Sequence, residues 1–217
     1  MSVMPPAVRA LPVELYQLGR RVVRPRDAAG LYYNPRAEFR RLAEAGALRH
    51  LAHGYYLIPP QEALGDPRWR PEVEELALGV AASDHGEGVS LMGLSAARHH
   101  GAVPRAHATA WVAVPVNRRP LDAGVFGRIV FVARHLDRLD LVRARTTVVD
   151  GHATSVEQTI VDLARHPTWA GGADTAREAI VRLWPRADRV LLDDLAVAQR
   201  GQAALDRFRI AQADLGA

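Results

Sequence analysis

Three arginines on one predicted helix form the most suggestive group of chemically active side chains in the sequence. Residues 35–45 read PRAEFRRLAEA, in which Phe39 and Leu42 share one face while the arginines point elsewhere: Arg36, Arg40 and Arg41. Guanidinium groups are permanently charged and pair well with phosphate oxygens. An isolated charge run is also typical of a solvated helix face. Here four more arginines come shortly before the helix, which favours binding to the backbone of DNA: Arg20, Arg21, Arg24 and Arg26.

The arginines are concentrated at the start of the chain. Residues 1–60 carry nine arginines and four acidic residues, whereas residues 61–217 carry nineteen arginines and twenty acidic residues. The first segment therefore has a net charge of +5, which suits a small domain that binds phosphates. Lysine is absent, so a phosphate-loop lysine, a Schiff base and the lysines of kinases and restriction-type nucleases are all excluded.

No other group of residues has the spacing of a catalytic or metal-binding motif. The one histidine cluster contains adjacent residues that point apart on a helix, so capping of a helix C-terminus is favoured over a metal site: His99, His100 and His107. Pairs of aspartates are expected to be solvated: Asp137, Asp140, Asp193 and Asp194. The chain has no cysteine and no G-x-S-x-G elbow. We therefore expect no catalytic residues, no metal and no cofactor.

The first sixty residues predict a winged helix-turn-helix. Helices are expected over 10–19, over about two turns from Pro25 to near Gly30, and over 35–45, with Asn34 as N-cap and an optional short strand at 20–23. The stretch ALRHLAHGYYLIP then predicts a β-hairpin. In this plan the third helix enters the major groove and the hairpin lies along the backbone as the wing.

The hairpin adds three candidate DNA contacts: Arg49, His53 and Tyr55. Of the adjacent Tyr55 and Tyr56, one is expected to face the core and lock the wing to the helices, and the other to offer its hydroxyl to a phosphate. The alternative is that at least one of the two tyrosines is simply a core residue.

A proline-rich stretch, 59–71, marks the boundary between two expected domains, 1–62 and 63–217. The sequence of the second domain predicts helices over 71–86 and 90–101, and Ser90 is expected to be the N-cap of the second one. A small, mostly antiparallel sheet is expected over 108–154. Ser155 then begins a helix that ends at Pro167, and three further helices are expected near 172–184, 188–199 and 202–213. The fold class is therefore α+β.

The first residues of the chain lack both a basic segment followed by an apolar one and any run of about twenty apolar residues. Together with the absence of cysteine, this predicts a cytoplasmic protein with no membrane partner.

Four segments give the chain its resemblance to a known family. They are AGALRHLAHGYYLIPP at the predicted wing and, after the proline-rich stretch, VSLMGLSAARHHGA, AWVAVP and TTVVDGHATSVEQTIVDLARHP. On these segments the chain resembles the AbiEi family, the antitoxins of type IV, AbiE-like toxin–antitoxin pairs used in phage defence. The resemblance covers residues 8–170 and leaves the last three predicted helices without a counterpart.

The resemblance implies an antitoxin that binds inverted repeats in its own promoter and represses its operon. Its functional partner would be a nucleotidyltransferase-like toxin, which such antitoxins are thought to counteract without a stable complex. The alternative is an enzyme, a phosphotransferase or nuclease that modifies the toxin or nucleic acid and uses the winged helix for targeting.

Overall fold

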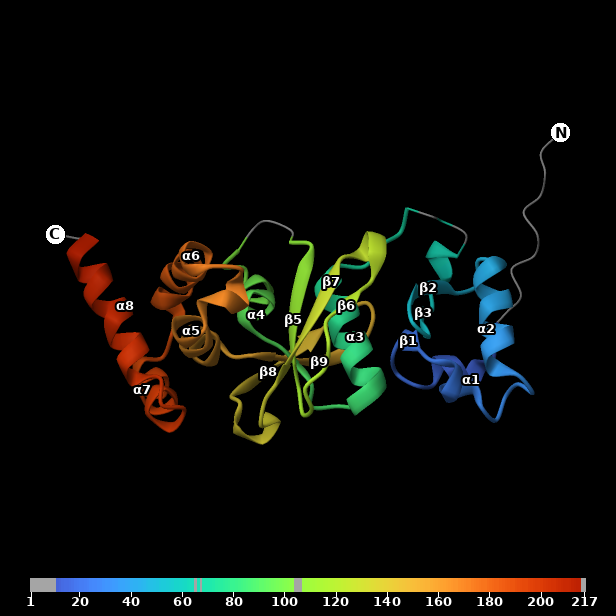
Figure 1. The fold of residues 1–217 in the computed structure, drawn as a ribbon, viewed down its shortest axis with the longest axis horizontal. Coiled ribbons are helices and arrows are strands. Elements are labelled where there is room, and N and C mark those ends of the chain that lie inside the picture. The colour runs from blue at the N-terminus through green and yellow to red at the C-terminus, as the bar shows by residue number, and fades with distance from the viewer. Residues whose placement is uncertain (1–10, 65, 67, 104–106, 216–217) are drawn as a thin grey trace.

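The computed structural model describes residues 11–64, 66, 68–103 and 107–215. An N-terminal segment, a six-stranded sheet and a set of C-terminal helices follow one another along the long axis of the molecule (Figure 1). Helix α3 (Val73–His85) lies between the N-terminal segment and the sheet. The expected α+β class is confirmed.

The N-terminal segment contains short helices and a small antiparallel sheet of strand order β1-β3-β2. Its elements are α1 (Val13–Tyr16), β1 (Val22–Val23), the 3-10 helix η1 (Pro25–Ala28), α2 (Pro35–Glu44), β2 (Arg49–Ala52) and β3 (Tyr55–Leu57). The predicted strand, hairpin and third helix are confirmed. The predicted two-turn second helix is wrong in type, because the Asp27 carboxylate accepts a hydrogen bond from the backbone N–H of Arg24 at 2.8 Å and closes a single tight turn.

Helix α2 begins as its sequence predicts. The side chain of Asn34 accepts a hydrogen bond from the backbone N–H of Ala37 at 3.2 Å, and Pro35 occupies the first helical position. Phe39 and Leu42 are buried in a core of the N-terminal segment. These two contacts fix which face of the helix is left to solvent.

The two adjacent tyrosines of β3 point to opposite sides, as successive residues of a strand must. Tyr56 packs edge-on against Phe39, with ring centroids 5.2 Å apart, inside the N-terminal core. Tyr55 faces the other way and joins the core between α3 and the central sheet. The hairpin therefore contributes to two cores at once.

The central sheet has the strand order β6-β7-β5-β4-β9-β8 and is mixed. Three of its neighbouring strand pairs are antiparallel, but β5 pairs with β7, and β4 with β9, in parallel. The prediction of a mostly antiparallel sheet is confirmed for three of the five strand pairs and wrong for the other two, which include the longest register, between β5 and β7. The strands are β4 (Ser90–Leu91), β5 (Thr109–Val114), β6 (Leu121–Asp122), β7 (Arg128–Ala133), β8 (Leu141–Arg145) and β9 (Asp150–Thr154).

Ser90 does not cap a helix, contrary to the sequence prediction. It lies in β4, where it pairs with Ala113 of β5 on one side and His152 of β9 on the other. Helix α4 (Gly93–His99) begins only after this strand. A two-residue strand leaves too little periodicity in the sequence to be recognised, and its position inside the sheet depends on partners far along the chain.

Helices cover both faces of the sheet, which explains the almost continuous apolar sequence of β5. Ala110, Val112 and Val114 face the core around α3, whereas Trp111 and Ala113 face the core formed by the later helices. Those helices are α4, α5 (Val156–Arg165), α6 (Ala173–Leu183), α7 (Arg189–Ala198) and α8 (Gln202–Leu215), and the predictions for the last four are confirmed. Further 3-10 turns are η2 (Gln61–Ala63), η3 (Gly124–Phe126), η4 (Leu136–Arg138), η5 (Pro167–Ala170) and η6 (Trp184–Arg186).

A buried polar network holds the C-terminal helices to the sheet. Ser155 caps α5 as predicted, since its hydroxyl accepts a hydrogen bond from the Gln158 N–H at 3.0 Å. One turn later the buried carboxylate of Asp162 accepts bonds from Arg134 at 2.8 Å and from the Gln158 amide at 3.0 Å. The Gln158 amide also bonds to that of Gln199 at the end of α7. Burial raises the pKa of Asp162, and the charge of Arg134 opposes this.

The N-terminal segment packs tightly against α3 at Gly79. A Cβ atom at this position would lie 2.6 Å from a methyl group of Val148 and 2.7 Å from one of Val22. Val22 belongs to β1, and Val148 to the connection between β8 and β9. Gly79 therefore lets both halves of the chain approach the same turn of α3.

We expect Gly79→Ala to lower the free energy of unfolding. Overpacking against two β-branched side chains costs about 1–3 kcal/mol, which outweighs the gain of roughly 1 kcal/mol that alanine brings inside a helix. The matched control is Gly30→Ala, because a Cβ at Gly30 has no heavy atom within 4 Å. Urea unfolding of both variants checks this, and equal stability of Gly79→Ala and the wild type would contradict the tight packing.

Candidate nucleic-acid interface

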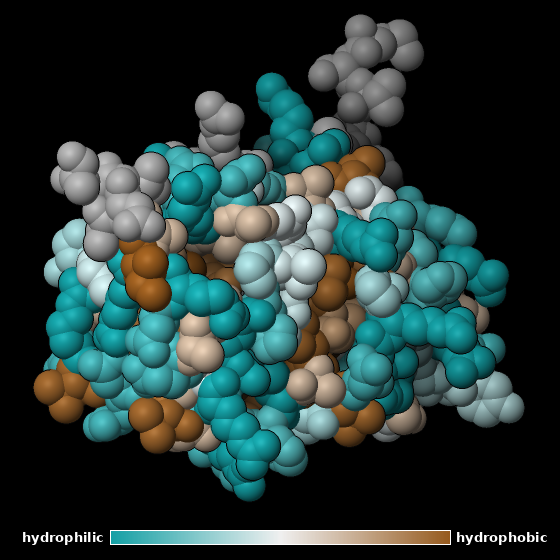
Figure 2. All heavy atoms as spheres, turned by 60° about the vertical axis from the view of Figure 1, so that its left-hand side comes forward, coloured by the Kyte–Doolittle hydropathy of each residue, from teal (hydrophilic) through white to brown (hydrophobic). Residues whose placement is uncertain are grey.

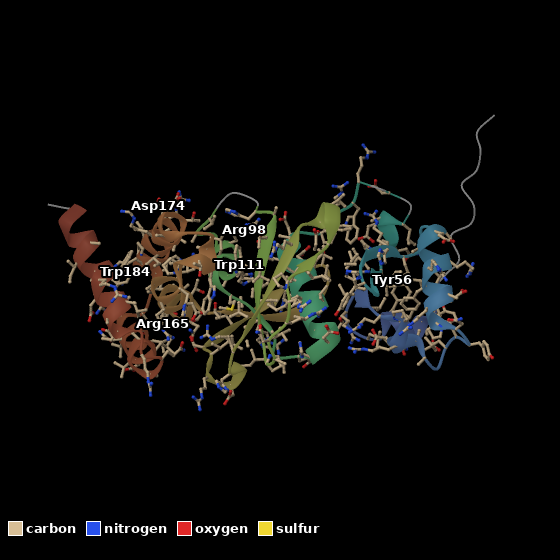
Figure 3. All side chains as sticks on the ribbon, viewed as in Figure 1. Tyr56, Arg98, Trp111, Arg165, Asp174 and Trp184 are labelled. Atoms are coloured by element: carbon tan, nitrogen blue, oxygen red, sulfur yellow. The ribbon has the colours of Figure 1, made fainter. Side chains whose placement is uncertain are left out.

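A groove of about 950 Å³ runs between the start of α2 and the turn that joins β2 to β3. Its walls come from η1, the connection from η1 to α2, the first turns of α2 and the hairpin turn. Among the residues that the structure describes, those that line the groove include four arginines and a histidine but no carboxylate: Arg24, Pro25, Arg26, Ala29, Tyr33, Asn34, Pro35, Arg36, Arg40, His53, Gly54 and Tyr56. Figure 3 places Tyr56 within the N-terminal segment, where this residue of β3 packs against Phe39 of α2. The groove is therefore lined by positive charge.

Arg36 and Arg40 supply the charge that is available to a ligand. They lie one helical turn apart on the exposed face of α2. Neither forms an ion pair with another residue in the described part of the chain. The start of α2 also borders the groove, and the partial positive charge of a helix N-terminus adds to the guanidinium charges.

His53 borders the groove from the opposite side. It is exposed at the hairpin turn, where its φ of 28° places it in the left-handed region. Gly54 follows with a φ of 81° and completes the turn. The hairpin therefore presents a short polar tip towards α2.

Arg24 and Arg26 line the groove and also bind residues of α3. Both form ion pairs with Asp84, and Arg26 donates a further hydrogen bond to the carbonyl oxygen of Ser83 at 2.7 Å. The Arg26 side chain remains 55% exposed, compared with 27% for Arg24. These two arginines thus connect the groove to the second half of the molecule.

Asp84 is the centre of that connection. Its carboxylate also accepts a hydrogen bond from the Tyr55 hydroxyl at 2.5 Å and pairs with Arg118, which follows β5. Burial alone would raise the pKa of Asp84, but the hydrogen bond from Tyr55 and the charges of Arg24 and Arg118 outweigh it and lower the pKa. The same surroundings raise the pKa of Tyr55, chiefly through burial and then through the bond to Asp84.

Tyr55 is therefore misplaced in the predicted set of DNA contacts. Its side chain is buried, its hydroxyl is engaged by Asp84, and the guanidinium groups of Arg24 and Arg118 lie over its ring at 4.7 and 5.2 Å. The tyrosine locks the hairpin to the rest of the chain. Strand alternation allowed this, but the sequence did not show which of the two tyrosines would take the role.

Arg20 and Arg21 do not line the groove either. Arg20 forms an isolated β-bridge with Val149 and an ion pair with Asp27 at 3.2 Å. Arg21 donates from its side chain to the carbonyl oxygen of Thr147 at 2.8 Å. Both residues attach the N-terminal segment to the connection between β8 and β9.

Arg41 and Arg49 have local partners outside the groove. Arg41 pairs with Glu38 on α2 through two hydrogen bonds, which raise its pKa. Arg49 donates to the backbone carbonyl groups of Asp66 and Trp69, and burial lowers its pKa. Five of the ten predicted contacts therefore meet at the groove: Arg24, Arg26, Arg36, Arg40 and His53.

The sequence prediction missed three residues that matter at this surface. Tyr33 and Tyr56 line the groove, and Asp84 holds two of its arginines. Tyr33 directly precedes the Asn34 cap, so its place beside the start of the third helix was a usable signal. Asp84 carried no signal, because its partners lie about 30 to 60 positions away in the sequence.

The other candidate residues occupy separate positions. His99 ends α4, and His100 follows it as C-cap, with its Nε2 atom 2.7 Å from the carbonyl oxygen of Thr154. Burial lowers the pKa of both histidines. Within residues 11–64, 66, 68–103 and 107–215, no group of three or more histidine, aspartate or glutamate residues is placed to hold a metal ion.

Neither the protein-family models nor the curated proteins include a match to this chain. Among solved structures, the RV2827C protein from Mycobacterium tuberculosis is similar to 91% of this chain and 82% of its own, with 20% identity and a TM-score of 0.41. In the part of the chain that the structure describes, none of the helices is both long enough and apolar enough to cross a membrane.

We expect Asp84→Asn to lower the free energy of unfolding by about 2 kcal/mol at pH 7, because several donors lose their charged acceptor. The folded-state pKa of Asp84 is lowered, so its contribution is complete above the pKa of unfolded aspartate, about 3.9, and is lost as the pH falls through the folded value. The stability gap between wild type and variant should therefore shrink below about pH 4.

Asp174→Asn is the matched control for this measurement. Asp174 (Figure 3) lies in the first turn of α6, whereas Asp84 belongs to α3, and the Asp174 side chain is 97% exposed. Its substitution should change stability by less than about 0.5 kcal/mol. A gap for Asp84→Asn that stays constant from pH 7 to pH 3 would contradict the electrostatic role of the carboxylate.

Proposed function

We propose that this chain binds double-stranded DNA and that residues 11–58 act as a winged helix-turn-helix. The observation that carries the proposal is the groove between α2 and the hairpin turn, with its four arginines and no carboxylate. In the proposed arrangement α2 is the recognition helix and the β2–β3 hairpin is the wing. The order of α1, η1, α2 and the hairpin agrees with that plan.

The size of α2 suits the major groove. An α-helix with its side chains is about 10–12 Å wide, and the major groove of B-DNA is about 12 Å wide. Arg36 near the start of α2 can then reach a base edge, and Arg40 a base edge or a flanking phosphate. The exposed face that carries both residues is left open because Phe39 and Leu42 hold the opposite face in the core.

The second half of the chain differs from the first in its charge. Residues 61–217 carry a net charge of −1, and many of their arginines are paired with carboxylates. We infer that this half supports a different task. The resemblance to the AbiEi family suggests that this task is neutralisation of a nucleotidyltransferase-like toxin. In the same proposal, the groove binds inverted repeats in the promoter, and this binding represses the operon.

We expect Arg36→Ala and Arg40→Ala each to weaken binding to a duplex selected from a random pool. Loss of a phosphate contact should reduce the slope of log affinity against log salt concentration by about 0.9, and loss of a guanine contact should cost about 1–3 kcal/mol on the selected duplex alone. Affinity for selected and random duplexes at several salt concentrations separates the two roles.

Arg207→Ala serves as the control, because Arg207 is an exposed arginine of α8 at the other end of the molecule. It should leave both affinity and salt slope close to those of the wild type. If Arg36→Ala and Arg40→Ala bind the selected duplex as the wild type does, while remaining folded, the proposed interface is wrong.

We further expect the Arg36→Ala, Arg40→Ala double variant to lose repression of a promoter reporter but to retain neutralisation of the toxin encoded in the same operon. The two activities use different halves of the chain in this proposal. Growth of toxin-expressing cells and reporter output are measured together. Loss of both activities in a folded protein, or an operon without such a toxin, would argue against the antitoxin role. A change in toxin mass after incubation with the chain, ATP and magnesium would instead support an enzyme.

A further inference from the structure

Tyr33 is a fully exposed aromatic residue at the edge of the groove. It lies between Tyr32, which packs against the N-terminal core, and Asn34, which caps α2. These neighbours fix the backbone on both sides of Tyr33 and direct its ring to solvent. Among the residues that line the groove, it offers the most exposed apolar surface.

We propose that Tyr33 is a specificity-determining residue that packs against the C5-methyl group of a thymine. This inference rests on the proposed binding of duplex DNA by α2. Residues at the start of a recognition helix contact base edges, and Tyr33 directly precedes the cap of that helix. The thymine methyl is the one apolar group that the base edges present in the major groove, so an aromatic ring at this place distinguishes thymine from the other bases.

The groove is poorly suited to the alternative of stacking on unpaired bases. Sites for single strands use several exposed aromatic rings on which successive bases stack. Here the second tyrosine of the groove, Tyr56, is buried edge-on against Phe39 and lies 5.2 Å from the ring of His50. Tyr33 is thus the one tyrosine ring in the groove wall with an open face.

The experiment uses the full chain and a duplex selected by the wild-type protein from a random pool. Each thymine of that duplex is replaced in turn by deoxyuridine, which removes only the methyl group. Replacement of one particular thymine in each half of the inverted repeat should lower the wild-type affinity about fourfold, because this is the effect of one buried methyl group. With Tyr33→Ala, binding to the unmodified duplex should already be weakened by a similar factor, and the same replacement should have no further effect.

Two further variants isolate the contact. Tyr33→Phe keeps the ring and should behave as the wild type, whereas a hydroxyl bound to phosphate would make it resemble Tyr33→Ala. Tyr16→Ala is the matched control, since Tyr16 is an exposed tyrosine of the same segment on α1 and does not line the groove. It should retain the full response to deoxyuridine. Because Tyr33 is exposed, the variants should unfold at the wild-type temperature.

The outcomes separate this inference from the proposed function. If the wild type selects no duplex, both fail. If Arg36→Ala weakens duplex binding but Tyr33→Ala responds to every deoxyuridine as the wild type does, only the role of Tyr33 is overturned. The same holds if Tyr33→Phe loses as much affinity as Tyr33→Ala, or if Tyr33→Ala weakens binding to single strands alone.

Discussion

The arrangement of the two halves of the chain depends on the bonds made by the carboxylate of Asp84. This carboxylate accepts a hydrogen bond from the Tyr55 hydroxyl of the hairpin. It also forms ion pairs with Arg24 beside η1 and Arg118 beside the sheet. Donors of this kind offset the free-energy cost of removing a carboxylate from water. Because the donors come from three separate parts of the chain, satisfying one charge also fixes where those parts lie. The apolar contacts of β1 and β3 with α3 then form around this fixed point.

This arrangement ties the basic groove to the second half of the chain. Arg24 and Arg26 line the groove and at the same time pair with Asp84, so their positions depend on α3. Arg36 and Arg40 depend only on α2 and its packing. Two arginines of the groove therefore have a charge that Asp84 partly balances. The charges of the other two, Arg36 and Arg40, are available to a ligand.

A second buried aspartate has a corresponding role on the other side of the sheet. Asp162 of α5 accepts hydrogen bonds from Arg134 at the end of β7 and from Gln158, whose amide continues to Gln199 beside α7. The C-terminal helices are thus attached through a polar network as well as through their apolar core. Figure 2 shows the side of the molecule that these helices form, where hydrophilic residues cover much of the surface and apolar ones occur mostly in small groups.

The elements whose signals are local could be predicted from the sequence. Asn34 and Pro35 begin α2, Ser155 begins α5, and the His53-Gly54 turn joins β2 to β3, because capping and turn geometry need only nearby residues. The concentration of arginines near α2 likewise predicted a positively charged surface in this part of the chain. Only half of the predicted residues line the groove, since a sequence shows the charge of a side chain but not its partner.

The features that depend on partners far away in the sequence could not be predicted in this way. Tyr55 and Tyr56 alternate in any strand, but which of them is buried against α3 was set by Asp84, 29 positions later. Ser90 became part of a strand because β5 and β9 lie on either side of it. Three arginines of the predicted interface instead bind groups that are distant in the sequence or lie outside the groove. Arg21 and Arg49 donate to backbone carbonyl groups, and Arg20 forms an ion pair with an aspartate. Pairings of this kind arise only when the chain closes on itself, so local pattern cannot specify them.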